Sequence, residues 1–287
     1  MTAFDCAAII GTKDRPRELA ACLASLAAAQ PGFREVIVAD QGAGAAPASP
    51  AGLPLAYLKL ERSGLAYARN QALQHATAEW VFFPDDDCTV APDLLARADE
   101  ALERLPDASF LSGRVLAPGV EARADSPRVL ASPPEILKSM SAGLFVKRAL
   151  LEELHGFDER FGVGSTYPSG EESELLFRAL RKGARGVYAP EIRVFHEDPF
   201  TTLPQAEVER RAFEYGRGWG AMFSKHAMGP GGKVYQSLYI KYVARALGGA
   251  TLAFLTLRPA LARRYMASYR GRSHGWHEWY MRERFGP

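Results

Sequence analysis

Short runs of apolar, β-branched and aromatic residues alternate with amphipathic stretches over the first two thirds of the chain. Runs of this kind, bounded by polar or glycine-rich segments, are typical of buried strands. They occupy residues 4–10, 35–39, 55–60, 80–83, 110–116 and 144–147. Between them, apolar residues recur at helical spacing, which predicts helices at 15–29, 65–75 and 92–105. The alternation predicts a doubly wound α/β sheet.

Ligands of such sheets gather at the carboxyl ends of the strands. Thr12, Asp40 and Asp85 lie at or just after the ends of three predicted strands, so we expect the chemistry there. The stretches 41–54 and 117–134, rich in glycine, alanine and proline, are predicted to be surface loops. Beyond residue 200 the strand signals stop. Helices are predicted at 205–223, 234–257 and 259–269, with breaks at 229–232 and at Arg258-Pro259.

Composition is that of a globular protein, with 47% hydrophobic and 24% charged residues. The three cysteines are scattered and form no Cys-x-x-Cys pair, which argues against a disulfide framework or a zinc knuckle and fits a reducing compartment. We see no secretory leader and no apolar stretch of about 18 residues, the length that a membrane span needs. These features predict a cytoplasmic protein.

Charge divides the chain in two. Residues 1–200 hold 21 Lys and Arg against 28 Asp and Glu, a net charge of −7, whereas residues 201–287 hold 14 against 5, a net charge of +9. A basic tail is typical of proteins that meet phosphate, nucleic acid or an anionic lipid surface. No aromatic-interleaved motif accompanies it, so we predict no nucleic-acid partner.

An apolar strand runs directly into three acids, Asp85, Asp86 and Asp87. Adjacent like charges repel, so a cation is expected among them. In extended geometry Asp85 and Asp87 project to one side and Asp86 to the other. Two carboxylates that face one point suit Mg²⁺ or Mn²⁺. The alternative is a turn that caps the helix near Pro92, but capping needs only one acid.

A second acidic cluster, at residues 170–176, includes Glu171 and Glu172 and precedes a helical pattern. Taken alone, acids in a first turn are explained by the helix dipole. His196 closes a short apolar run at 192–195, and a lone histidine is more often a surface or core residue than a metal ligand.

Seven motifs occur in an order that characterises a known family. They are Thr12-Lys13-Asp14-Arg15-Pro16, Val36-Ile37-Val38-Ala39-Asp40, Gly64 to Asn70, Phe83-Pro84-Asp85-Asp86-Asp87, Gly156-Phe157-Asp158, Gly170 to Leu175 with Arg178 and Gly183, and Val194-Phe195-His196. With them the chain resembles the inverting nucleotide-sugar glycosyltransferases of family 2, which have the GT-A fold. The resemblance covers residues 4 to about 200. It implies a GT-A-like doubly wound mixed sheet flanked by helices, followed by a C-terminal helical extension.

The resemblance assigns roles residue by residue. It implies that Thr12, Arg15, Asp40, Arg69, Asn70, Asp85 and Asp86 contact the nucleotide-sugar, with Asp40 accepting a hydrogen bond from the nucleobase. Asp85 and Asp87 are expected to bind the Mn²⁺ or Mg²⁺ ion that bridges the donor diphosphate, and His196 to complete the metal shell. Charge that grows on the leaving diphosphate would be neutralised there.

Inversion in one displacement needs a base that takes the proton of the acceptor hydroxyl. Similar enzymes usually have Glu-Asp at that point, whereas this chain has Glu171-Glu172. Glu172 matches the base but is one methylene longer, so the base is either Glu172 or Glu171. A second departure is Lys13-Asp14, where relatives often carry Tyr-Asn, and it bears on donor choice.

The expected domains follow from the resemblance. Residues 1–200 form the catalytic domain, with nucleotide-sugar binding in 1–116 and the acceptor and base part in 117–200, and residues 201–287 form a basic helical extension. UDP-sugars are the commonest donors among similar enzymes, and the acceptor is expected to be a glycan or a lipid-linked sugar in bacterial surface polysaccharide or glycolipid synthesis.

The segment 239–257, with basic residues downstream and Trp276, Trp279 and Tyr280 nearby, is too short and too charged to span a bilayer. It could lie on the inner face of the cell membrane as a basic amphipathic helix and bring the active site to a lipid-linked acceptor. The alternative is packing on the sheet or against a second copy of the chain.

Three other functions fit the sequence less well. A dinucleotide oxidoreductase is disfavoured because no Gly-x-Gly-x-x-Gly follows the first strand. A sugar-phosphate nucleotidyltransferase needs a glycine-rich basic loop there, and only Lys13, Arg15 and Arg17 are available. A non-catalytic nucleotide-sugar binding subunit would have lost the base, whereas acids remain at every expected place.

Overall fold

The computed structural model describes residues 4–120, 124–137, 141–197, 200 and 203–286. The chain forms two compact units. Unit 1 comprises Met1–Phe157 and Leu175–Glu197, and unit 2 comprises Asp158–Glu174 and Asp198–Pro287. The expected domain boundary at 200–201 touches residues outside the described part, and the division into a catalytic domain and an extension stays a prediction. Residues 158–174, assigned above to the catalytic part, belong to the same unit as the C-terminal helices.

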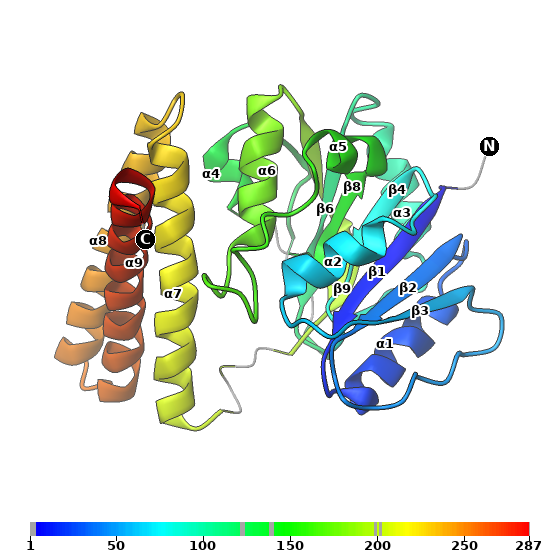
Figure 1. Cartoon of the computed structure of the whole chain (residues 1–287), viewed down its shortest axis with the longest axis horizontal. Helices are drawn as coiled ribbons and strands as arrows, with labels where there is room; N and C mark the ends of the chain where they lie inside the picture. Colours follow the sequence, from blue (N-terminus) through cyan, green and yellow to red (C-terminus); the bar gives the residue numbers. More distant parts are fainter. Residues whose placement is uncertain (1–3, 121–123, 138–140, 198–199, 201–202, 287) are drawn as a thin grey trace. The chain divides into compact units, whose positions relative to one another are not determined.

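In the described residues, unit 1 is built on one mixed sheet of nine strands (Figure 1). The strands are β1 (Cys6–Thr12), β2 (Glu35–Asp40), β3 (Leu55–Lys59), β4 (Trp80–Phe83), β5 (Thr89–Val90), β6 (Phe110–Leu116), β7 (Arg128–Leu130), β8 (Leu144–Lys147) and β9 (Gly186–Phe195). Their order is β3-β2-β1-β4-β8-β6-β9-β5, with β7 also paired to β9. The first four strands are parallel, and β8 is antiparallel to both β4 and β6.

Helices cover both faces of this sheet. The helices and short turns of this part of the chain are α1 (Pro16–Ala27), α2 (Leu65–Leu73), α3 (Leu94–Leu102), α4 (Pro133–Ile136), η1 (Ser141–Gly143), α5 (Arg148–Glu153) and α6 (Glu171–Arg181). Apolar residues of α1 and α3, among them Leu23 and Leu95, share one core cluster with Ile10 of β1. On the opposite face α2 approaches β1 at Gly11, where a Cβ atom would lie 2.6 Å from Cδ1 of Leu65. Any larger residue at Gly11 would have to displace the Leu65 side chain, so glycine favours close packing of the strand and helix.

The predicted fold class is confirmed: a mixed α/β sheet is flanked by helices, and a helical region follows it. All six predicted strands and all three predicted helices of the first 150 residues are present. The prediction of 117–134 as loop was wrong at β7, because Arg128, Val129 and Leu130 pair with β9, and at its end, because α4 begins at Pro133. Residues 121–123 of that stretch lie outside the described part. The partner strand is more than fifty residues away, so no local pattern reveals the pairing.

In unit 2 the long helices are α7 (Gln205–Ala227), α8 (Lys233–Leu255) and α9 (Pro259–Phe285). The breaks between these helices lie where the glycines at 229–232 and the Arg258-Pro259 pair predicted them. The third helix is much longer than the predicted 259–269, because Gly271 and Gly275 do not end it. Both glycines instead face the α7 backbone, where a Cβ atom would lie 2.0 Å from the carbonyl oxygen of Phe213 and 1.9 Å from that of Arg217.

Throughout the part of the chain that the structure describes, every helix is too short or too polar to cross a membrane.

Candidate active site

Three neighbouring parallel strands bring Thr12, Asp40 and Asp85 to one edge of the sheet. Thr12, the last residue of β1, is in register with Asp40, the last residue of β2. On the other side of β1 lies β4, which ends at Phe83 and leads into the acidic turn. The expectation that these residues share the carboxyl edge of the sheet is confirmed by the register.

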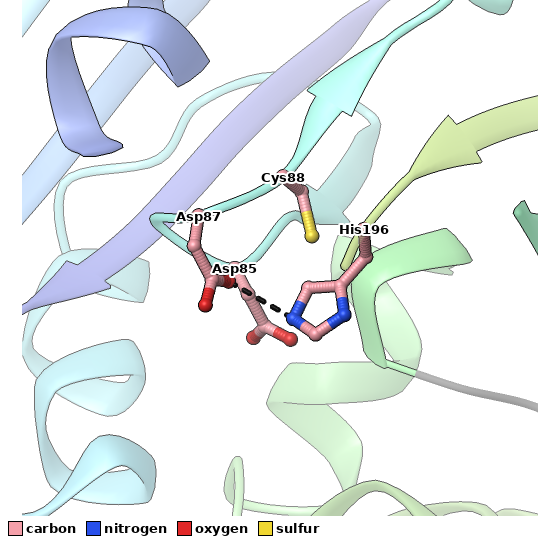
Figure 2. A group of neighbouring side chains, drawn as sticks. All are labelled: Asp85, Asp87, Cys88 and His196. Carbon is pink, nitrogen blue, oxygen red and sulfur yellow. Dashed lines mark ion pairs between the residues drawn. The ribbon is translucent and has the colours of Figure 1, made fainter. Parts of the chain in front are cut away.

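A cluster of potential metal ligands forms just beyond this edge. Asp85, Asp87, Cys88 and His196 each offer one ligand atom, and these atoms lie within 4.8 Å of one another. Figure 2 shows the two carboxylates, the thiol and the imidazole turned toward a common point. Asp85 and Asp87 thus converge as the sequence predicted. Two carboxylates and an imidazole are donors that suit Mn²⁺, and the carboxylates also suit Mg²⁺.

The short strand β5 explains how His196 reaches acids more than a hundred residues earlier in the chain. Thr89 pairs with Phe195 and Val90 with Val194 in antiparallel register. The residue that precedes β5 therefore lies opposite the residue that follows β9, which places His196 beside Cys88 and the acidic turn. The backbone amide of His196 also donates to the carbonyl of Leu116, 2.9 Å away.

Ion pairs hold the cluster together. Nε2 of His196 lies 3.1 Å from Oδ1 of Asp87, and Nη2 of Arg15 lies 2.8 Å from its Oδ2. Burial opposes ionisation of Asp87, but the bond from His196 and the charge of Arg15 lower its pKa to about 2. The same bond to Asp87, acting against burial, raises the pKa of His196. Asp87 therefore stays charged at neutral pH.

Cys88 is the one member of the cluster that the sequence analysis did not assign to the site. Its thiol is buried, and burial followed by the charges of Asp85 and Asp87 raises its pKa. A thiol that keeps its proton is a poor ligand for a hard cation. Cys88 thus forms a wall of the cluster, and its position directly after the three acids was the only sequence signal for it.

Asp86 is not part of the cluster, as expected, but the extended geometry assumed for the three acids was wrong. Asp86 and Asp87 lie in a turn, in which the amide of Cys88 donates to the carbonyl of Asp85 over 3.1 Å. Thr12 Oγ1 donates to its Oδ2 over 2.7 Å, and Arg15 Nη1 lies 2.8 Å from its Oδ1. Burial raises the pKa of Asp86, although Thr12 and Arg15 oppose the change. One guanidinium thus bridges two of the three consecutive acids, which relieves part of their mutual repulsion.

Arg69 reaches Asp85 from the buried side of the site. Its side chain is fully buried, its Nη2 lies 3.2 Å from Asp85 Oδ1, and its guanidinium carbon lies 5.6 Å and 5.5 Å from the ring centres of Phe83 and Phe157. Two aromatic faces fix a guanidinium in place. Arg69 therefore orients Asp85 from behind.

Asn70 braces the turn that carries Phe157. Its Oδ1 accepts from the amide of Phe157 over 2.8 Å, and its Nδ2 donates to the carbonyl of the same residue over 2.9 Å. Gly156 has a φ of 70° and lies against this amide group. The Arg69-Asn70 pair thus positions an acid and a turn, and its contact with a nucleotide stays a prediction.

Asp40 is buried and held from three directions. Its Oδ1 accepts from the amide of Gly42 over 2.7 Å, and its Oδ2 accepts from the hydroxyl of Tyr57 over 2.8 Å and from Lys59 Nζ over 3.2 Å. Burial opposes ionisation, but these bonds together lower the pKa of Asp40. The carboxylate is fixed and charged at the end of β2, and a bond from a nucleobase would have to share its remaining lone pairs.

The two candidate bases open α6 and belong to unit 2. Glu171 is buried, and its carboxyl carbon lies 3.1 Å from where a Cβ atom of Gly162 would stand. Gly162 has a φ of 99°, so glycine is needed there for the backbone as well as for the space. Glu172 is half-buried and thus the more accessible of the two.

Unit 2 also contains a buried charge network that the sequence analysis missed. Lys225 of α7 lies 2.6 Å from Asp158 and forms a very short ion pair with Glu174, whose side chain is fully buried. Burial opposes ionisation of Asp158, but Arg160 and Lys225 hold its pKa far below the usual range. This network ties the segment of the candidate bases to α7. Only the Gly156-Phe157-Asp158 motif pointed to one of its members.

Comparison with known proteins agrees with this geometry. The model of glycosyl transferase family 2 matches residues 7–153. The first 349 residues of TarS from S. aureus are 15% identical, with 99% of this chain and 92% of that chain covered and a TM-score of 0.54. The mannosyltransferase PcManGT from Pyrobaculum calidifontis, in complex with GDP-Man and Mn²⁺, is 20% identical, with coverages of 93% and 86% and a TM-score of 0.60.

A complex of TarS with UDP-GlcNAc is 16% identical, with coverages of 93% and 91% and a TM-score of 0.53. A search of curated protein sequences found no match. At these identities the solved structures share the fold, whereas the family match spans more than half of the chain.

Proposed function

This chain belongs to glycosyltransferase family 2, and we propose that it is a metal-dependent inverting enzyme that moves a sugar from a nucleotide-diphosphate sugar to an acceptor hydroxyl. The observation that carries the proposal is the convergence of Asp85, Asp87 and His196 at the edge of the sheet where β1 ends at Thr12 and β2 ends at Asp40. A glycosyltransferase needs a nucleotide, a cation and a base near one another. Candidate residues for the nucleotide site lie at the ends of β1 and β2, and those for the cation site include the turn after β4, the other neighbour of β1.

The donor is proposed to be a UDP-sugar, with its nucleoside at the ends of β1 and β2. Thr12 and Asp40 lie there in register. Arg15 stands between this edge and the acidic turn, where its guanidinium can reach a diphosphate as well as Asp86 and Asp87. Structural relatives hold UDP-GlcNAc or GDP-Man, which supports a nucleotide-diphosphate sugar as the donor class.

Asp85, Asp87 and His196 are proposed to hold Mn²⁺ or Mg²⁺. The fit test is the donor set: two carboxylates and an imidazole within 4.8 Å of one another, with Arg69 orienting Asp85. PcManGT was solved with Mn²⁺. When bound, the cation supplies positive charge to the leaving diphosphate. His196 would exchange its bond to Asp87 for a bond to the metal, which requires the neutral imidazole.

Glu172 is proposed as the base that removes the proton of the acceptor hydroxyl. The choice over Glu171 rests on exposure, because a base must touch its substrate and Glu171 is buried against Gly162. As the hydroxyl oxygen attacks the anomeric carbon, its proton passes to the Glu172 carboxylate. The bond from that carbon to the diphosphate breaks on the opposite side.

The acceptor is proposed to be a glycan or lipid-linked sugar of the kind used in bacterial surface polysaccharide or glycolipid synthesis. Supporting this, the residues Leu252, Phe254, Leu255 and Leu257, at and just after the C-terminal end of α8, are 63%, 74%, 71% and 89% exposed. We call these four residues the apolar patch. Exposed arginines follow it along the chain, at 258, 263 and 270. Apolar side chains bordered by cations suit peripheral attachment to an anionic membrane.

The first experiment is thermal stabilisation of the purified protein by UDP, dTDP and GDP, with and without Mn²⁺. A ligand at 100 times its dissociation constant adds about 2.7 kcal/mol, which at this size is a shift of roughly 2–8 °C. We expect a Mn²⁺-dependent shift with UDP. Asp87→Ala should abolish both that shift and sugar transfer, because it removes a carboxylate from the cation.

Asp107→Ala is the matched control, since Asp107 is an exposed acid paired only loosely with Arg185 over 3.7 Å. It should keep both the shift and the transfer. Full activity of Asp87→Ala would contradict the metal site. Metal-dependent nucleotide binding without transfer to any acceptor would move the chain to the class of non-catalytic nucleotide-sugar binding subunits.

A further inference from the structure

A cavity with the chemistry of an anion site lies entirely within unit 2. It has a volume of about 310 Å³ and opens between α7, α8 and α9. Arg245 of α8 and Arg264 and Arg272 of α9 line it, together with aromatic rings that include Trp219 and Tyr242. It shares no residue with the Asp85 cluster.

Helical spacing explains why two of the three arginines line the same cavity. Arg264, Ser268 and Arg272 are spaced four residues apart on α9, so they lie along one face of that helix, and all three line the cavity. On α7 the lining includes Gly216, where a Cβ atom would lie 2.6 Å from the carbonyl oxygen of Ser268. The backbones of α7 and α9 therefore approach closely at Gly216, beside the cavity.

Within the described residues, no carboxylate pairs with any of these three arginines. Other arginines of the same helices are paired: Arg263 lies 2.8 Å from Glu209, and Arg217 lies 2.8 Å from Glu278. Arg272 donates from Nη1 to the carbonyl of Tyr242 over 3.1 Å, while its buried Nε reaches no acceptor among the described residues. As far as the described residues show, the cavity therefore gathers positive charge without a carboxylate partner.

The shifted pKa of Arg272 is also consistent with an anion in this cavity. Burial lowers the pKa of Arg272, Tyr242 opposes the change, and the like charge of Arg245 adds to it. Arg264 and Arg272 are half-buried and Arg245 is exposed, so the like charges cost most at the two half-buried arginines, where a bound anion would compensate them. Arginine is the side chain that best matches the planar, bidentate geometry of phosphate oxygens.

Aromatic side chains also line the cavity and hold its arginines in place. The guanidinium of Arg264 stacks 4.1 Å above the ring centre of Phe200, and the rings of Trp219 and Tyr242 lie 5.3 Å apart. Stacking fixes the orientation of a guanidinium and leaves its N–H edge for a ligand. The cavity is also large enough for a diphosphate.

We propose that this cavity, which we call the arginine pocket, binds the phosphate or diphosphate group of a ligand. That group reaches the pocket either as a free anion or as the phosphate of a lipid, and the recognition chemistry is the same. The inference stands on unit 2 alone and holds whether or not the donor site works as proposed.

The test for a free anion is titration of the full chain with inorganic pyrophosphate in the presence of EDTA, followed by tryptophan fluorescence. Chelation removes the cation on which donor-site binding of a diphosphate is proposed to depend. We expect Arg264→Gln and Arg245→Gln each to weaken binding by about tenfold or more, since each removes a charge-assisted contact. Arg270→Gln is the matched control, because it removes the same charge from an exposed position of α9 that does not line the pocket.

The test for a lipid phosphate is cosedimentation with vesicles that contain phosphatidic acid, compared with vesicles of equal charge that contain phosphatidylglycerol. A preference for the phosphomonoester headgroup that Arg264→Gln loses and Arg270→Gln keeps identifies the lipid as the source. Binding of pyrophosphate with the same variant pattern identifies a free anion. If Arg264→Gln, Arg245→Gln and Arg270→Gln behave alike in both tests, the arginine pocket is overturned. Thermal melting of each variant checks that it is folded.

Discussion

Glu171 and Glu172 are adjacent acids whose surroundings differ at the scale of single atoms. Glu171 packs its carboxyl group against Gly162 at a point where any Cβ atom would intrude, whereas Glu172 is half-buried. Both open α6, so the helix dipole acts on each and does not distinguish them. Only their exposure separates a structural acid from one that can reach an acceptor.

We predict that Glu172→Gln keeps donor binding but lowers turnover by roughly 10²–10⁴-fold, because the amide cannot accept the hydroxyl proton. Glu171→Gln, the matched variant, should keep most turnover. The measurements are kcat for sugar transfer and the nucleotide-induced thermal shift of each variant. The reverse pattern, with turnover lost in Glu171→Gln alone, would assign the base to Glu171.

At the scale of elements, α7 and α9 pack through small residues spaced four apart. On α7 these are Ala212, Gly216 and Gly220, and on α9 they are Ala267, Gly271 and Gly275. Added Cβ atoms at Gly220 and Gly275 would lie 2.1 Å and 1.9 Å from carbonyl oxygens of the facing helix. The two backbones are in direct contact along these six small residues, which we call the seam. The helix contact therefore depends on the absence of larger side chains there.

We predict that Gly275→Ala destabilises the folded chain by about 1–3 kcal/mol, the usual cost of overpacking. Gly248→Ala is the control, because Gly248 lies in α8 and its added methyl group would meet nothing within 4 Å. That variant should be neutral or stabilising by about 0.5–1 kcal/mol, since alanine favours helix. Opposite shifts of the urea-unfolding midpoint of the helical unit are the expected result, and equal shifts would rule out the seam.

At the scale of the whole molecule, charge and apolar surface divide between the two parts of the chain. The net charge is −7 over residues 1–200 and +9 over residues 201–287. The apolar patch belongs to the basic part, and its four side chains are among the most exposed large hydrophobic residues of the structure. This combination supports the proposal that the chain meets an anionic membrane through its C-terminal helices.

We predict that the full chain cosediments with anionic vesicles at low salt and is released at high salt. Replacing Phe254 and Leu257 together by serine should lower the vesicle-bound fraction about tenfold or more, because both lose apolar burial in the lipid interface. Val120→Ser is the control, as Val120 is 56% exposed in unit 1. Absence of vesicle binding at low salt would contradict membrane attachment and leave helix packing or a second copy of the chain as the role of the patch.

Local pattern accounts for much of the fold. The runs at 35–39, 80–83 and 144–147 coincide with β2, β4 and β8 to within one residue, because each is apolar enough to be buried on both faces. The C-terminal helix was predicted too short, because glycine reads locally as a helix breaker and only the facing backbone of α7 explains it. β7 was missed for the corresponding reason, since its hydrogen bonds go to β9.

Some features of the candidate site were likewise predictable from the sequence, and others were not. The sequence by itself determined the family, the strand ends that carry Thr12 and Asp40, and the acidic turn, because periodicity and spacing are local properties of the chain. Only the tertiary structure decided that Cys88 joins the cluster, that Arg69 supports Asp85 from the core, and that α8 and α9 bring three arginines to one cavity. Those facts depend on contacts between residues far apart in the chain, and such contacts exist only once the sheet and the helices have packed.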